Sequence, residues 1–376
     1  MPFESGREGI PAGSVAPSSL QERFPVFRIH FRARPLAGLA VLALLAAAPA
    51  AKPDDDMQKV LDALAALGPK PIATLSPAEA RRQPTPADAV KRVLAKAGRD
   101  AKPEALVPGV TSEDREVQGA AGMLPARIYT PAGKGPFPVI VYYHGGGWVI
   151  ADKNVYDGGA RGLAKAANAV VVSADYRLAP EHKFPAQHDD ALAVYRWTLA
   201  HAAELKADTA RVALAGESAG GNLAVATAVA ARKAGLTMPV HILSVYPIAQ
   251  ADTTTPSYVQ YAEAKPLNRA MMGWFARNVS RTPADLQDPR ISLVKADLHG
   301  LPPVTIVNAQ IDPLLDDGAM LEQALTRAGV AVKRKVYEGS THEFFGMAAV
   351  EQDARDAQAW AGKRLAAAFA GQRAGR

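Results

Sequence analysis

The chain has 376 residues, of which 48% are hydrophobic and 21% are charged, a composition typical of folded globular proteins. Its 43 basic and 37 acidic residues leave a formal net charge of +6, but they are spread along the chain without long basic runs, so we expect no nucleic-acid partner. Cysteine is absent, which excludes disulfides, a cysteine nucleophile and thiolate metal sites, and leaves the cellular compartment open.

Residues 26–50 have the pattern of a secretory signal peptide. Three arginines and a histidine lie within residues 28–34, an apolar run of Leu, Ala and Val follows over 36–48, and Ala48-Pro49-Ala50 supplies small residues for cleavage. The apolar run is too short to span a bilayer. We therefore expect cleavage near Ala50 and a periplasmic or secreted product without a stable membrane anchor. A buried helix in a cytoplasmic protein is the alternative.

Residues 1–25 do not fit an export signal. They are rich in Ser, Gly, Pro and charged residues, a composition typical of disorder. They also separate Met1 from the positively charged region, which should stand at the N-terminus of a signal peptide. We therefore expect that translation starts near Val26 and that the first 25 or so residues result from start-codon assignment.

Two helices are expected after the signal. Residues 54–67 begin with acidic side chains, have an apolar stripe at helical spacing and end before Gly68-Pro69, and residues 86–97 form a second helical stretch. Neither stretch contains residues suited to catalysis. We treat residues 51–110 as an N-terminal helical segment.

From about Thr111 the pattern changes to strands that alternate with helices. This alternation predicts a mostly parallel sheet covered by helices on both faces, and we assign residues 111–376 to it. Residues 251–298 interrupt the rhythm with no convincing strand and one helical stretch near 268–279, so we expect an insertion over the sheet. The expected strands are 114–118, 124–129, 138–143, 169–174, 211–215, 240–246, 304–308 and 332–337, and the main helices are 156–167, 187–202, 218–234, 316–328 and 350–370.

The sequence around Ser218 predicts a nucleophile elbow. Gly216-Glu217-Ser218-Ala219-Gly220 has the pattern G-x-S-x-G, which by itself is only moderate evidence. A predicted strand comes directly before it and a predicted helix directly after it, which is the setting that the elbow needs. Two glycines allow the tight turn that lifts the serine to the carboxyl edge of the sheet. A serine that only caps the helix is the structural alternative.

A glycine-rich turn follows an earlier strand. His144-Gly145-Gly146-Gly147-Trp148 comes directly after the apolar strand at 138–143. Glycines leave backbone N–H groups free of side-chain obstruction. We expect the N–H groups of Gly145, Gly146 and Ala219 to form an oxyanion hole for a tetrahedral intermediate of acyl transfer.

A nucleophilic serine needs a base, and the base needs a group that orients it. Of the later histidines, His342 follows the last predicted strand in a loop, whereas His241 lies within a strand and His299 lies beside a turn. The acid should lie between the serine and the histidine in chain order, and Asp312 follows a predicted strand there. We therefore expect Ser218, Asp312 and His342 to form a catalytic triad. The nearby Asp316 and Asp317 are expected to cap the next helix.

From about residue 54 onward the sequence resembles the bacterial hormone-sensitive-lipase-like esterases. The resemblance rests on the His144–Trp148 turn, the segment Asp175-Tyr-Arg-Leu-Ala-Pro-Glu181, the elbow, Asp312-Pro-Leu and the His342 loop, all in family order. It implies an α/β-hydrolase fold with a helical cap, built from the N-terminal helices and residues 251–298, over an acyl pocket. It also implies hydrolysis of short- to medium-chain carboxylic esters without cofactor or metal. The family commonly has Asp or Thr where this chain has Glu217.

Two other functions use the same residues. An amidase or peptidase would form a similar acyl-enzyme and differ only in the leaving group. A catalytically inactive homologue would bind a small ligand, although such proteins usually lose the serine or the histidine. We expect Trp274 and Phe275 to roof the pocket and the 175–181 segment to form an ion-paired structural turn. A homodimer and a monomer both remain open.

Overall fold

The strands form one eight-stranded sheet with the order β1-β2-β4-β3-β5-β6-β7-β8. The computed structural model describes residues 51–374, so the expected signal peptide and the residues before it lie outside the described part. β2 runs antiparallel to both of its neighbours, and all other pairs are parallel, which confirms the mostly parallel sheet. The strands are β1 (Val110–Gly119), β2 (Gly122–Pro131), β3 (Phe137–Tyr143), β4 (Val170–Ala174), β5 (Ala207–Glu217), β6 (His241–Val245), β7 (Val304–Ile311) and β8 (Val332–Thr341).

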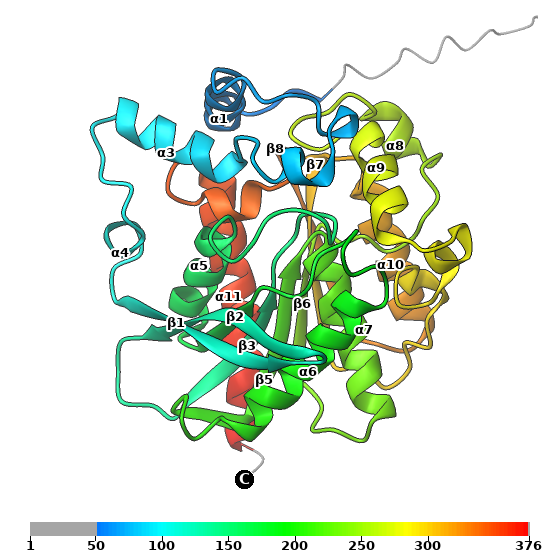
Figure 1. Ribbon diagram of the computed structural model, residues 1–376. Helices are drawn as coiled ribbons and strands as arrows, with labels where there is room; N and C mark the ends of the chain where they lie inside the picture. Colours follow the sequence, from blue (N-terminus) through cyan, green and yellow to red (C-terminus); the bar gives the residue numbers. More distant parts are fainter. Residues whose placement is uncertain (1–50, 375–376) are drawn as a thin grey trace, which may run out of the picture. The chain divides into compact units, whose positions relative to one another are not determined.

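Helices cover both faces of this sheet (Figure 1). Because side chains along a strand alternate between faces, Val139 and Val141 of β3 belong to one core and Ile140 and Tyr142 to the other. The first core is closed by α6, α7 and α10, and the second by α5 and α11. These helices are α5 (Asp157–Ala167), α6 (Ala186–Ala200), α7 (Ala219–Lys233), α10 (Leu315–Arg327) and α11 (Gln352–Ala374).

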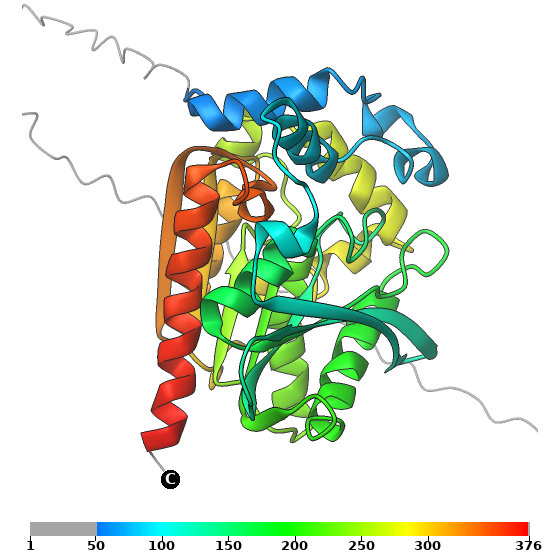
Figure 2. The same ribbon diagram turned by 90° about the vertical axis from the view of Figure 1, so that its left-hand side faces the viewer.

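Most of the remaining helices gather at one end of the sheet, while the short α4 lies lower, at the side of the molecule near α5 (Figures 1 and 2). They come from the two segments expected to form a cap, and among the described residues the 251–298 segment contains no strand, as expected. Trp274 donates from its indole N–H to the carbonyl of Leu75 at 2.9 Å, which joins the two segments. These helices are α1 (Asp55–Ala65), α2 (Pro77–Ala80), α3 (Pro86–Lys96), α4 (Pro103–Leu106), α8 (Pro256–Gln260) and α9 (Arg269–Val279). Within residues 51–374, four short 3-10 turns complete the fold at Ile72–Thr74, Pro283–Gln287, Leu293–Lys295 and Phe344–Met347.

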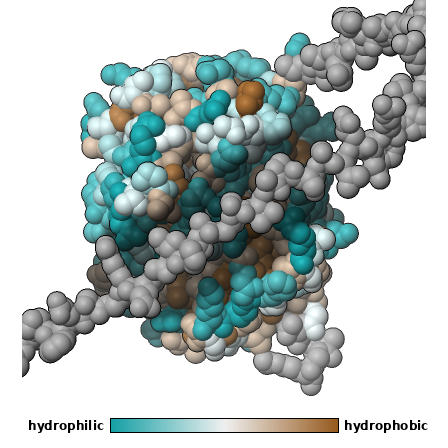
Figure 3. Space-filling model, turned by 90° about the vertical axis from the view of Figure 1, so that its right-hand side faces the viewer, coloured by the Kyte–Doolittle hydropathy of each residue, from teal (hydrophilic) through white to brown (hydrophobic). Residues whose placement is uncertain are grey.

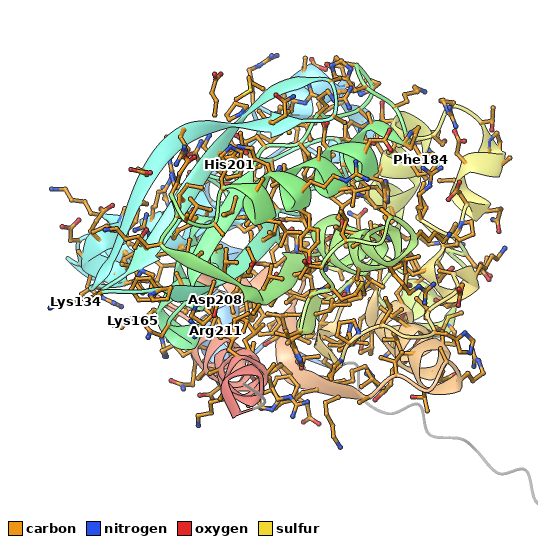
Figure 4. The ribbon with its side chains drawn as sticks, turned by 90° about the horizontal axis from the view of Figure 1, so that it is seen from below. Lys134, Lys165, Phe184, His201, Asp208 and Arg211 are labelled. Carbon is orange, nitrogen blue, oxygen red and sulfur yellow. The ribbon has the colours of Figure 1, made fainter. Side chains whose placement is uncertain are left out.

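The opposite end of the sheet is tied by an ion pair at the start of β5. Arg211 donates to Asp208 and to the carbonyl of Pro136, each at 2.8 Å, and Figure 4 shows the two charged residues side by side from below. The N–H of Phe137 donates to the carbonyl of Lys206 at 2.8 Å, so β3 and β5 start in a fixed register. This anchoring leaves the carboxyl ends of the strands to present functional side chains.

The surface formed by the described residues is mixed in polarity on the face shown in Figure 3. Over residues 51–374, no helix has both the length and the apolar character needed to cross a bilayer.

Candidate active site

Ser218 lies at the sharp turn between β5 and α7. Its backbone has φ 58° and ψ −118°, a conformation that a residue with a side chain rarely adopts. The flanking glycines make the turn sterically possible. A Cβ at Gly216 would lie 2.2 Å from the carbonyl oxygen of Gly220, and a Cβ at Gly220 would lie 1.9 Å from that of Tyr143. The predicted strand–turn–helix elbow is therefore present.

The three residues of the expected triad meet at the carboxyl ends of β5, β7 and β8. His342 Nε2 lies 3.0 Å from Ser218 Oγ, and His342 Nδ1 lies 2.7 Å from Asp312 Oδ2. The second oxygen of Asp312 accepts the backbone N–H of Leu314 at 2.9 Å, which fixes the carboxylate. All three side chains are buried. In this arrangement Nδ1–H donates to the aspartate and Nε2 accepts the serine proton.

Burial and nearby carboxyl groups act in opposite directions on His342. Burial disfavours its protonated form, but the negative charge and hydrogen bond of Asp312, with smaller contributions from Glu343 and Glu217, outweigh it and raise the pKa of His342 above 6.5. The imidazole is thus a stronger base than a free histidine.

The glycine-rich turn is held from behind by Tyr176. The hydroxyl of Tyr176 donates to the carbonyl of His144 at 2.9 Å, and the two rings stack with centroids 4.2 Å apart. Because these contacts fix the outer side of the turn, Gly145 and Gly146 are held beside the elbow. Ala219 is the first residue of α7, so its N–H has no acceptor within the helix.

The segment from Asp175 to Glu181 is an ion-paired structural turn, as expected. Asp175 pairs with Lys153 at 2.9 Å, Arg177 with Asp190 at 2.7 Å, and Glu181 with Arg81 at 2.7 Å. Arg81 also donates to the carbonyl oxygens of Val149 and Ala179 at 2.8 Å. The last pair therefore joins the N-terminal segment to the loops behind the glycine-rich turn.

Glu217, directly before Ser218, is fully buried. It accepts short hydrogen bonds from the hydroxyls of Tyr142 and Tyr246. Burial raises the pKa of its carboxyl to about 8, and the two tyrosine hydrogen bonds only partly offset this effect. Gly159 of α5 leaves room for the side chain, since a Cβ there would lie 2.0 Å from Glu217 Oε1.

Glu343 is a third carboxyl group at the site, after Asp312 and Glu217, and sequence reasoning did not identify it. Its Oε1 accepts the hydroxyl proton of Tyr156 at 2.6 Å and lies 3.9 Å from His342 Nε2. Its backbone has φ 74°. Tyr156 is 187 positions away in the chain, so no local sequence pattern connects the two residues. The available signal was a glutamate directly after the expected catalytic histidine.

A cavity of about 530 Å³ extends from this cluster toward the N-terminal helices. Glu217, Glu343 and Tyr156 line it at the site, and Val90 and Leu94 of α3 line it on the other side. Its volume lies within the range of small-molecule pockets. Helix α3 therefore belongs to the wall of a pocket.

The two expected roof residues lie beside the glycine-rich turn and the N-terminal segment. Phe275 packs against Gly147 of the glycine-rich turn, where a Cβ would lie 2.3 Å from its ring, and Trp274 contacts Leu75. Neither aromatic residue lines the cavity.

The capping prediction for the acids after Asp312 was wrong. Asp316 accepts the backbone N–H of Ser257 at the start of α8, and buried Asp317 accepts that of Ala249 in the loop after β6, so neither side chain caps its own helix.

The other candidate histidines are structural, as expected. His241 Nε2 lies 2.8 Å from Thr305 Oγ1 inside the sheet, and exposed His299 lies 3.0 Å from Asp297. Over residues 51–374, no cluster of three or more histidine or acidic side chains is arranged to hold a metal ion.

An eight-stranded sheet of this order, with a strained serine at the elbow, defines an α/β hydrolase. Residues 140–346 match the family model described as alpha/beta hydrolase fold, and the chain belongs to this family. It is 39% identical over 290 residues to the carboxylesterase NlhH of Mycobacterium tuberculosis, covering 75% of this chain and 90% of the relative. It is 35% identical over 237 residues to the ethyl acetate hydrolase of Pseudomonas putida, covering 61% and 74%.

Solved structures agree with this assignment. The hyperthermophilic esterase from the archaeon Pyrobaculum calidifontis superposes with a TM-score of 0.76 at 32% identity, covering 84% of this chain and 98% of that chain. A thermostable esterase from Pseudomonas putida gives a TM-score of 0.76 at 30% identity, with 86% and 99% covered.

Proposed function

We propose that the chain hydrolyses short- to medium-chain carboxylic esters through an acyl-enzyme formed on Ser218, with His342 as the base and Asp312 as its orienting acid. The main support is the hydrogen-bonded line from Ser218 Oγ to His342 at 3.0 Å and on to Asp312 at 2.7 Å. The similarity to carboxylesterases makes esters, rather than amides, the favoured substrates.

The first half of the reaction forms the acyl-enzyme. Ser218 Oγ gives its proton to His342 Nε2 and bonds to the carbonyl carbon of the ester. The N–H groups of Gly145, Gly146 and Ala219 stabilise the oxyanion, and the positive end of α7 contributes at the same point. When the tetrahedral intermediate collapses, the bond to the alcohol breaks and the alcohol oxygen takes the proton from Nε2.

The N-terminal segment 51–110 and residues 251–298 serve as a cap over this site. Through α3 the first segment lines the 530 Å³ cavity, which takes one apolar arm of the ester, acyl or alcohol. Each methylene buried in such a cavity contributes about 0.8 kcal/mol until the space is filled. Activity should therefore peak at short or medium chains and decline for long ones.

A substrate panel tests the proposal. Chromogenic esters with two to sixteen acyl carbons, short-chain esters of alcohols of increasing size, and the matching anilides would be compared on the purified chain. We expect short and medium esters to react fastest and anilides to react far more slowly. Anilides that match the esters would indicate an amidase instead. No turnover of any member, with intact folding, would favour a ligand-binding protein.

We also propose that the enzyme is exported and that its mature chain begins near Ala51. The support is the order of basic residues, apolar run and Ala48-Pro49-Ala50, all in the part of the chain outside the described residues. N-terminal sequencing of the protein from its native cell tests this location. A cytoplasmic product that retains residues 36–48 would contradict it without affecting the ester-hydrolase assignment.

A further inference from the structure

Glu343 has a backbone conformation that its residue type does not favour. With φ 74° and ψ 0° it lies in the left-handed region, where a Cβ is disfavoured and glycine is the usual residue. Positive φ occurs at seven described residues with a side chain, and two of the others, Ser218 and Tyr246, contact His342. Strain of this kind persists where the surrounding structure enforces it, and it often marks a functional position.

The side chain of Glu343 is held toward the reacting face of His342. The hydroxyl of Tyr156 donates to Oε1 at 2.6 Å, and the same oxygen lies 3.9 Å from His342 Nε2. Tyr156 is itself fixed, because it packs against Gly145, where a Cβ would lie 2.2 Å from its hydroxyl. The Glu343 side chain is 18% exposed and lines the cavity, so water can reach it, whereas Glu217 borders the same cavity but is fully buried.

Two acceptors at this separation suit a single water molecule. A water that lies at ordinary hydrogen-bond distance from His342 Nε2 can direct its other O–H to an oxygen 3.9 Å from that nitrogen. We propose that Glu343 orients the water that hydrolyses the acyl-enzyme. This inference rests on the proposed function and concerns only its second half.

Hydrolysis of the acyl-enzyme leaves Glu343 chemically unchanged. The water gives one proton to His342 Nε2, and its oxygen forms a bond to the acyl carbon, which produces the oxyanion. The intermediate then collapses, the bond from the acyl carbon to Ser218 Oγ breaks, Oγ takes the proton from Nε2, and the carboxylic acid leaves. Glu343 accepts a hydrogen bond from the second O–H of the water and neither gains nor loses a bond.

A purely structural role makes a different kinetic prediction. If Glu343 only supported Tyr156, or only adjusted the position or basicity of His342, its loss would slow the transfer to Ser218 and the release by water together. If Glu343 orients water, its loss slows only the release of the acyl group. The first half of the reaction uses no water, because the ester itself supplies the carbonyl carbon and the leaving alcohol.

The test compares Glu343→Gly, which also relaxes the left-handed backbone, and Glu343→Leu, which keeps a side chain of similar size without a hydrogen-bond acceptor, with the parent enzyme. Two esters with the same acyl group and different chromogenic alcohols would be followed by stopped flow. We expect kcat to fall about 10- to 100-fold, while kcat/KM stays within about threefold. We also expect a burst of one alcohol per active site and the same kcat for both alcohols. The rate of phosphonate labelling at Ser218 should not change.

Asn168→Gly is the matched control, since Asn168 also has a positive φ of 47° but follows α5 away from the triad. It should change thermal stability without producing a burst. Equal losses in kcat and kcat/KM for the Glu343 variants would overturn the inference, as would unchanged values of both. If the parent enzyme neither turned over esters nor was labelled at Ser218, the proposed function itself would fail, and that result is independent of the variants.

Discussion

His342 is surrounded by carboxyl groups that favour its protonated form. Asp312 contacts Nδ1 directly, and Glu343 and Glu217 contribute more weakly, so the pKa of the imidazole is raised although burial acts against it. The base must be neutral to accept the serine proton. Because protonation inactivates it, we predict that kcat/KM rises with pH through a midpoint above 6.5. A pH–rate profile that stays flat down to about pH 4.5 would contradict a histidine base.

Glu217 makes the stability of the fold depend on pH. Its carboxyl has a pKa of about 8 in the folded chain and an ordinary value of 4.5, so between these values the folded state binds more protons than the unfolded state. The free energy of unfolding therefore falls as pH rises from about 4.5 to 8. Glu217→Gln keeps a polar side chain between Tyr142 and Tyr246 but does not ionise.

We predict that Glu217→Gln gains stability relative to the parent enzyme as pH rises. Thermal unfolding at pH 5 and pH 9 measures the difference in melting temperature between the variant and the parent enzyme. This difference should favour the variant more at pH 9 than at pH 5. Glu116→Gln on the exposed side of β1 is a suitable control, because an exposed carboxyl should leave the difference between the two pH values unchanged. A constant difference for Glu217→Gln would show that its carboxyl ionises normally.

Single residues also show how far the sequence can predict a site. Ser218, Asp312 and His342 follow strands in an order that topology dictates, so they could be found without coordinates. The contact of Tyr156 with Glu343 depends on the packing of α5 against the loop after β8. This packing cannot be predicted from the spacing of residues in the chain. The left-handed backbone of Glu343 could not be predicted from the sequence either, because glutamate has no preference for this conformation.

The element that positions Ser218, the proposed nucleophile, is the turn between β5 and α7. Gly216 and Gly220 approach backbone oxygen atoms so closely that a methyl group cannot be accommodated by a side-chain rotation. We predict that Gly216→Ala and Gly220→Ala each abolish phosphonate labelling of Ser218 and lower the melting temperature. Gly371→Ala, with open space around its Cβ on α11, should keep activity and leave stability unchanged or up to about 1 kcal/mol higher. Active, normally labelled elbow variants would contradict this description.

The eight strands and the long helices were predictable because their apolar periodicity extends over enough residues to be read. The exact ends of the strands and helices were less predictable. β1 was expected over 114–118 but spans Val110–Gly119, because the length of this strand is set by its hydrogen bonds to β2 and not by its composition. The short helices α2, α4 and α8 have four or five residues each, too few for a periodic pattern.

At the scale of the whole molecule, the N-terminal helices provide both core and pocket wall. Leu64 of α1 and Leu94 of α3 are buried in the same core, but only Leu94 lines the cavity. Leu94→Ala and Leu64→Ala should each lose about 2–5 kcal/mol of stability. We predict that only Leu94→Ala also shifts the preferred ester length upward, by one or two carbons, because it enlarges the cavity. Rate measurements over the acyl and alcohol series test this, and parallel shifts in both variants would contradict the assignment of the cavity.

The central claim is that Ser218 and His342 act as one unit in ester hydrolysis. The most direct measurement is kcat on a short chromogenic ester for Ser218→Ala, His342→Ala and the double variant, with the site of phosphonate attachment mapped in the parent enzyme. The account predicts losses of several orders of magnitude in each single variant, little further loss in the double variant, and attachment at Ser218 alone. Multiplying losses in the double variant, or attachment to another residue, would contradict it.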